Sequence, residues 1–153
     1  MRFTILGCGS SPGVPRITGD WGACDPLNPK NRRRRASLLV ERIVADGGKT
    51  VVVIDTGPDF RDQMISAEVK WLDAAVYTHA HADHLSAAAY LQDKIGGKTA
   101  IGESITLVQS SFKKLFNLGP EFVADGLHFD HRITDGEILR VGEIALKAIS
   151  VPG

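Results

Sequence analysis

Three histidines and one aspartate lie within six positions of the segment THAHADH, residues 78–84. Alternate residues of an extended backbone project to the same side, so His79 and His81 are expected to face one way. Asp83 and His84 follow where the chain is expected to turn into a helix. Neutral imidazole and carboxylate are ligands that Zn²⁺, Mn²⁺ and Fe²⁺ select. The spacing therefore predicts that these four side chains bind metal.

Two adjacent metal ions would divide the four ligands, with His79 and His81 on one ion and Asp83 and His84 on the other. A water molecule between the ions would lose a proton near neutral pH and become a nucleophile. Asp83 is the predicted catalytic residue because it would also orient that water. One ion held by His79 and His81, with or without His84, is favoured over two ions, since four protein ligands leave two ions with many open positions and weak binding. A cluster of surface histidines in a polar loop is the competing interpretation.

The elements around this segment predict an α/β layered fold in a single domain, residues 1–153. The metal segment follows a buried strand at 72–79, the usual place for function in such folds. Residues 18–35 are polar and are expected to be irregular. The other expected strands lie at 2–6, 36–43, 50–57, 99–101, 137–141 and 144–151, and the expected helices at 58–69, 83–96 and 104–119.

The composition, 43% hydrophobic and 24% charged over 153 residues, is typical of a soluble globular protein. Lys plus Arg and Asp plus Glu are 18 each, so no global field favours nucleic acid or an anionic membrane as a partner. The longest apolar runs, such as 50–54, are too short to cross a bilayer. Only four residues precede the sequence ILGC, too few for a secretion signal, so a cytoplasmic location is expected.

The H-x-H-x-D-H form of the metal segment resembles the signature of the metallo-β-lactamase-fold hydrolases. The sequence VVVIDTGPD, residues 51–59, resembles the second motif of that superfamily. The resemblance implies the N-terminal half of an αββα sandwich, a mixed sheet with flanking helices. It also implies that Asp55 hydrogen-bonds within the metal loop and holds the histidines in place. From the residues alone, Asp55 has another interpretation, as the end of a strand or the cap of the helix after Pro58.

The resemblance divides near residue 84. Residues 1–84, with LGCGSSPGVPR and GDWGACDPLNPKNRRRRASLLV, resemble the cyclic phosphodiesterases and tRNA 3′-processing nucleases of the superfamily. Residues 85–153, with DGLHFDHRITDGEILRVGEIALKAISVPG, resemble the glyoxalase II and persulfide dioxygenase branch. The phosphodiesterase branch continues its signature with H-G-x-D-D, where this chain has LSAAAY. A natural intermediate, a recombinant and an engineered chimera remain open.

A complete site in this superfamily adds a later His after a PG pair, a bridging Asp and a final His, whereas this sequence ends on Pro152–Gly153. The resemblance therefore covers part of a site and leaves enzymatic activity uncertain. His128 and His131 lie in a turn-rich segment and are expected to be solvated loop residues rather than substitute ligands. Half of the fold would leave apolar sheet surface uncovered, so a homodimer or a missing C-terminal half is expected to cover it.

Three functions follow from these observations. The first is a metal-dependent hydrolase in which metal-bound hydroxide attacks a small-molecule phosphodiester, with one or two Zn²⁺, or with Mn²⁺ or Fe²⁺. The second is the thioester or persulfide chemistry of the other branch. The third is a metal-binding half-domain without turnover. The arginine run Arg32–Arg35 either attracts phosphate or forms a solvated charged turn.

Overall fold

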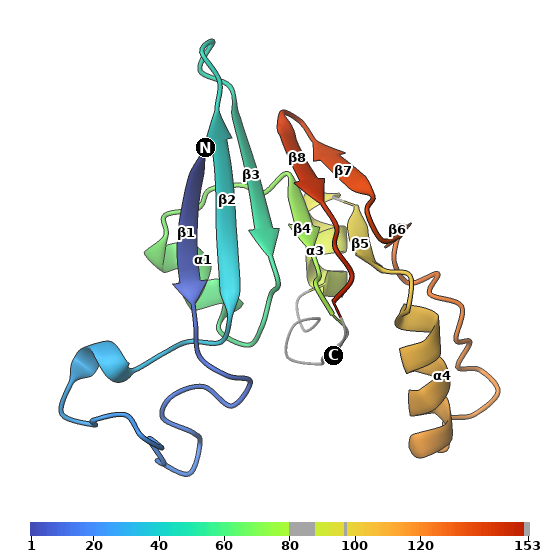
Figure 1. The fold of residues 1–153 in the computed structure, drawn as a ribbon, viewed down its shortest axis with the longest axis horizontal. Coiled ribbons are helices and arrows are strands. Elements are labelled where there is room, and N and C mark those ends of the chain that lie inside the picture. The colour runs from blue at the N-terminus through green and yellow to red at the C-terminus, as the bar shows by residue number, and fades with distance from the viewer. Residues whose placement is uncertain (80–87, 97, 152–153) are drawn as a thin grey trace.

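A computed structural model describes residues 1–79, 88–96 and 98–151 of the chain. Its main element is a six-stranded mixed sheet whose strands follow one another in chain order (Figure 1). The first three strands pair antiparallel and the next three add in parallel. The strands are β1 (Arg2–Gly7), β2 (Ser37–Ile43), β3 (Lys49–Ile54), β4 (Ala74–Val76), β5 (Thr99–Gly102) and β6 (His131–Ile133). The expected mixed sheet with flanking helices is confirmed.

One face of the sheet is covered by α1 (Phe60–Ser66), α3 (Ala88–Ile95) and α4 (Ile105–Leu115). Leu91 of α3 and Ile105 of α4 join Leu39, Val53 and other strand residues in one buried cluster, against which Phe60 and Met64 of α1 pack. The opposite face carries the hairpin of β7 (Ile138–Val141) and β8 (Ile144–Lys147). Ile144 packs there among the residues of a second cluster, which adds Val40, Val52 and Ala74.

β3 is the central strand of this arrangement. Val51, Val52 and Val53 are at most 2% exposed, because helices cover one face of the strand and the β7–β8 hairpin covers the other. A continuous β-branched run is what a strand buried on both faces requires. β3 places the residues that follow it, 55–59, at the edge of the sheet where β4 also ends (Figure 1).

The structure differs from the sequence-based elements in several places. The strand expected at 50–57 ends at Ile54, because Asp55 has a φ of 59° and leaves the extended conformation. The segment expected to be a loop contains β6, so His131 begins a strand, although His128 lies in an exposed turn as expected. β6 has only three residues and no apolar alternation, which explains why the pattern did not reveal it. A 3₁₀ turn, η1 (Pro29–Asn31), interrupts the segment expected to be irregular.

The strands at the C-terminal end are shorter than expected, and β8 stops at Lys147. His131 Nε2 contacts Glu137 Oε1, and the Thr134 N–H, together with that histidine, lowers the pKa of Glu137. This pairing gives His131 a structural partner within its own turn. Within the described ranges, no helix is both long and apolar enough to cross a membrane.

Candidate metal centre

Asp55 is the first residue after β3, and its backbone is fixed from two sides. Its N–H donates to the Val76 carbonyl at 2.9 Å, and the Ser37 hydroxyl donates to the Asp55 carbonyl at 2.7 Å. The φ of 59° is a left-handed conformation that costs a non-glycine residue about 1–3 kcal/mol. The two hydrogen bonds maintain that conformation, which turns the Asp55 side chain away from the direction of the strand.

The Asp55 carboxylate, in a residue only 7% exposed, accepts two hydrogen bonds from Thr78. The Thr78 N–H donates to Oδ1 at 2.8 Å and the Thr78 hydroxyl donates to Oδ2 at 2.6 Å. α1 begins at Phe60 with Asp59 as its N-cap residue, so Asp55 is not the residue at the helix start. The carboxylate therefore holds the first residue of THAHADH in place.

Thr78 in turn contacts His79, because its Oγ1 lies 2.8 Å from His79 Nδ1. A hydroxyl has one proton, and an ionised carboxylate only accepts, so the Thr78 proton goes to Asp55. Thr78 Oγ1 must then accept from Nδ1–H of His79. This tautomer leaves the lone pair of the imidazole on Nε2, the form in which a histidine binds a metal ion.

Tyr77 supports the same loop from the core side. It is 1% exposed at the end of β4, and the Thr56 hydroxyl lies 3.3 Å from its hydroxyl. Burial raises the pKa of Tyr77, so the phenol stays neutral at physiological pH. Tyr77 therefore links residues 55–57 to β4 without adding a charge beside Asp55.

Of the four predicted metal ligands, the structure describes His79, whose side chain is exposed. His81, Asp83 and His84 lie outside them, and their predicted roles are untested. Within residues 1–79, 88–96 and 98–151 there is no group of three or more His, Cys, Asp or Glu side chains placed to hold a metal ion. The tautomer of His79 nevertheless fits a metal ligand, since its donor nitrogen is occupied and its other nitrogen carries the lone pair.

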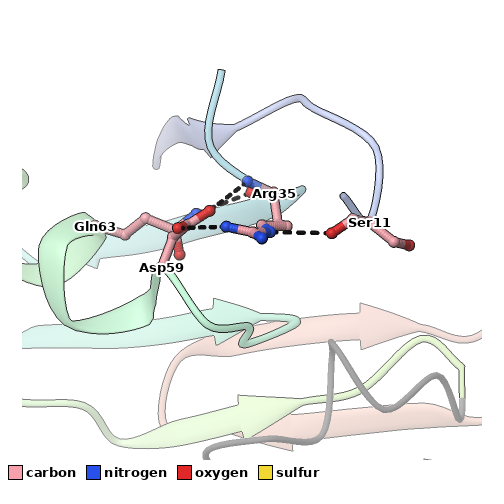
Figure 2. A network of polar contacts seen from close by, with 4 residues as sticks. All are labelled: Ser11, Arg35, Asp59 and Gln63. Carbon is pink, nitrogen blue, oxygen red and sulfur yellow. Dashed lines mark hydrogen bonds and ion pairs between the residues drawn. The ribbon is translucent and has the colours of Figure 1, made fainter. Parts of the chain in front are cut away.

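A second polar network, not anticipated from the sequence, joins Ser11, Arg35, Asp59 and Gln63 (Figure 2). Arg35 donates from its N–H and from NH1 to the two carboxylate oxygens of Asp59, at 2.8 and 2.9 Å. The Arg35 Nε donates to the Ser11 carbonyl at 3.0 Å, and Gln63 Nε2 donates to the Arg35 carbonyl at 2.9 Å. Asp59 consequently makes no side-chain cap bond at α1. Arg35 is thus neither a solvated turn residue nor available to phosphate as a lone charge.

The chain matches the family model described as "Metallo-beta-lactamase superfamily" over residues 33–153. It is 40% identical over 129 residues to a probable metallo-hydrolase of Burkholderia pseudomallei, covering 84% of this chain and 36% of that protein. It is 44% identical over 87 residues to a protein named glyoxylase B2 of Dictyostelium discoideum, covering 56% of this chain and 29% of that protein.

Two solved structures resemble the fold. A diphosphatase from the PhnP family superposes with a TM-score of 0.61 at 31% identity, covering 95% of this chain and 54% of that chain. Zn²⁺-bound PqqB from Methylobacterium extorquens gives a TM-score of 0.60 at 18% identity, covering 99% of this chain and 56% of that chain. The chain therefore spans between about a third and a little over half of the length of these relatives.

Proposed function

Because the chain belongs to the metallo-β-lactamase superfamily, we propose that it contributes a metal-binding site for hydrolysis of a phosphodiester or phosphoanhydride bond. The observation that carries the proposal is the hydrogen-bond chain Asp55–Thr78–His79, which presents the His79 lone pair at the C-terminal ends of β3 and β4. The choice of a phosphorus substrate rests on the similarity to the PhnP-family diphosphatase over 95% of the chain.

His79, His81, Asp83 and His84 would hold the metal ion, and zinc is the proposed metal. A bound zinc ion would supply Lewis acidity toward a phosphoryl oxygen. Asp83 is the residue proposed to orient the attacking water. Asp55 and Thr78 act before any substrate arrives, because they fix the ring orientation and the tautomer of His79. Such support by residues behind a ligand is commonly worth about 10–100-fold in metal affinity or activity.

The test is hydrolysis of bis(p-nitrophenyl) phosphate by the purified chain before chelation, after chelation and after zinc is restored. We expect release of nitrophenol to disappear with the chelator and to return with zinc. An Asp55→Asn variant should return a smaller rate than the wild type at equal zinc. Absence of turnover at every zinc loading would contradict the proposal and favour a metal-binding domain without turnover.

Thioester or persulfide chemistry is the second candidate, supported by the similarity to glyoxylase B2 over 87 residues. S-lactoylglutathione and glutathione persulfide are the substrates that distinguish it. Turnover of either one with no turnover of the phosphodiester would replace the first proposal by the second. The cytoplasm is the proposed location for either activity.

A further inference from the structure

A groove of about 690 Å³ lies between residues 12–17, the arginine run Arg32–Arg35 and the side of α1 that carries Ile65 and Ser66. The loop that forms one wall joins β1 to β2 at the sheet edge where β3 and β4 also end (Figure 1). A volume of this size is typical of sites for small organic ligands.

Backbone hydrogen bonds join the first part of this loop, residues 9–14, to the arginine run at its end. Val14 and Arg33 exchange a pair of bonds, with N···O distances of 3.1 and 2.9 Å, and the Gly9 N–H donates to the Arg34 carbonyl at 2.8 Å. Gly7 permits this approach, because a Cβ there would lie 2.0 Å from the Arg35 carbonyl oxygen. The arginine run is therefore presented from a fixed backbone rather than from a free loop.

The groove carries an excess of positive charge. Five arginines and two aspartates line it. Arg35 pairs with Asp59 and Arg16 pairs with Asp20, which leaves three arginines of the run, Arg32–Arg34, against Asp62. Arg34 NH1 donates to the Ser66 hydroxyl at 3.0 Å, a neutral partner that leaves its charge uncompensated. The exposed side chains of Arg32 and Arg33 take part in no hydrogen bond or ion pair found among the described residues.

The groove also has an apolar part. Ile17 is fully exposed on one wall and Ile65 is 60% exposed on the other. No aromatic side chain lines the groove in the described part of the chain, so the stacking platform that single-stranded nucleic acids use is absent there. Positive charge beside exposed isoleucines fits an anion with a small hydrocarbon group.

We propose that this groove binds an organic phosphate or diphosphate ester. The phosphate lies against the guanidinium groups of Arg32, Arg33 and Arg34, since arginine forks match phosphate oxygens geometrically. The hydrocarbon part lies against Ile17 and Ile65. The Arg35–Asp59–Gln63 network fixes the end of the arginine run on α1 (Figure 2). Binding here requires no metal ion, so it is independent of the proposed hydrolysis.

Isothermal titration of the full chain with isopentenyl diphosphate, at low salt and with EDTA present, tests this inference. Inorganic pyrophosphate is the second probe, and isopentenol is the phosphate-free control. We expect isopentenyl diphosphate to bind more tightly than pyrophosphate, isopentenol not to bind, and added salt to weaken both anions. An Ile17→Ser variant should remove the advantage of the isopentenyl group.

The double variant Arg32→Ala/Arg33→Ala should weaken isopentenyl diphosphate binding by about tenfold or more, as expected for the loss of charge-assisted hydrogen bonds. Arg140→Ala is the matched control, because Arg140 is an exposed arginine of β7 that does not line the groove, and it should change binding less than about twofold. Absence of binding to the wild type, or equal losses in the double variant and in Arg140→Ala, would overturn the proposal. Circular dichroism confirms that each variant is folded.

Discussion

Two buried carboxylates, one on β2 and one directly after β3, have opposite surroundings. Glu41 of β2, 2% exposed, forms ion pairs with Arg2 and with Lys49, whose Nζ lies 2.6 Å from Oε1. Asp55, after β3, is 7% exposed, and its carboxylate accepts from the amide and hydroxyl of Thr78. The first arrangement compensates a buried charge, and the second passes its effect to a histidine at the sheet edge. Burial of an acid alone therefore does not distinguish a structural role from a functional one; its partners do.

The cations around Glu41 also favour the ionised form of its carboxyl group. The hydrogen bond from Arg2, with a further contribution from Lys49, lowers the pKa of Glu41 against the opposing effect of burial. The Lys49 ammonium lies 5.3 Å from the centroid of the Trp71 ring, which adds a cation–π contact to the same cluster. This cluster contains only residues that pair with one another, so we expect it to stabilise the fold and to leave metal binding unaffected.

The largest expected effect is on zinc binding by Asp55→Asn. Asparagine tolerates the left-handed φ, so the backbone is retained, but the amide group replaces one of the two oxygens that accept from Thr78. Competition titration with a zinc chelator should show affinity reduced by about 10–100-fold. Urea unfolding should show a smaller change in stability than the Glu41 variant produces. Unchanged zinc affinity would show that Asp55, like Glu41, stabilises the fold without affecting metal binding.

The next effect is on stability, from Glu41→Gln. Loss of the carboxylate removes both ion pairs of the cluster, although the exposed Arg2 regains water. We expect the free energy of unfolding to fall by about 1–3 kcal/mol, with zinc affinity unchanged. Glu143→Gln is the control, because Glu143 is an exposed acid whose ion pair with Arg42 spans 4.0 Å. A reduced zinc affinity in Glu41→Gln would show that the two regions are coupled.

The pH dependence of stability tests the role assigned to Glu41. Folding lowers the pKa of the Glu41 carboxyl. Such a group stabilises the fold fully at pH values above its pKa in the unfolded chain, about 4.3, and this stabilisation is lost as the pH falls through the lower pKa of the folded state. The stability difference between wild type and Glu41→Gln should therefore be constant from pH 7 to about pH 5.5 and should shrink below about pH 4.5. Urea unfolding across this range measures it. A difference that grew on acidification would contradict the assigned direction.

The smallest expected effect concerns self-association. Phe3 and Ile5 of β1 are 63% and 73% exposed, and they pair with Val40 and Leu38 on the face that also packs the β7–β8 hairpin. We propose that a second copy of the chain covers this strip. Size-exclusion chromatography with light scattering should give a dimer for the wild type and a larger monomer fraction for Phe3→Ser/Ile5→Ser. A compact wild-type monomer would contradict the proposal.

The sequence predicted the central strand, which the structure confirms, whereas the metal-binding role of residues 78–84 stays a prediction. Both predictions rest on strong local patterns. A run of β-branched residues indicates β3, and H-x-H-x-D-H indicates a ligand set. The resemblance also implied that Asp55 hydrogen-bonds within the metal loop, and in the structure its carboxylate accepts from Thr78. The wider role of Asp55, holding the other histidines, stays a prediction.

The features that escaped prediction depend on contacts between distant residues. Arg35 and Asp59 are 24 positions apart, and nothing in the run of four arginines indicates that one of them pairs with the residue before α1. The three residues of β6 form a strand because they pair with β5, not because of their own pattern. Such pairings follow from the assembled sheet rather than from local sequence.

We infer that Asp55 acts through the Thr78 hydroxyl to present a metal-binding nitrogen of His79. The most direct test is the zinc affinity of Thr78→Val relative to Thr78→Ser, measured by competition with a zinc chelator. Valine keeps the shape of threonine without the hydroxyl, whereas serine keeps the hydroxyl. Thr78→Val should weaken zinc binding by about tenfold or more, and Thr78→Ser should stay within about threefold of the wild type. Equal affinities for the valine variant and the wild type would contradict it.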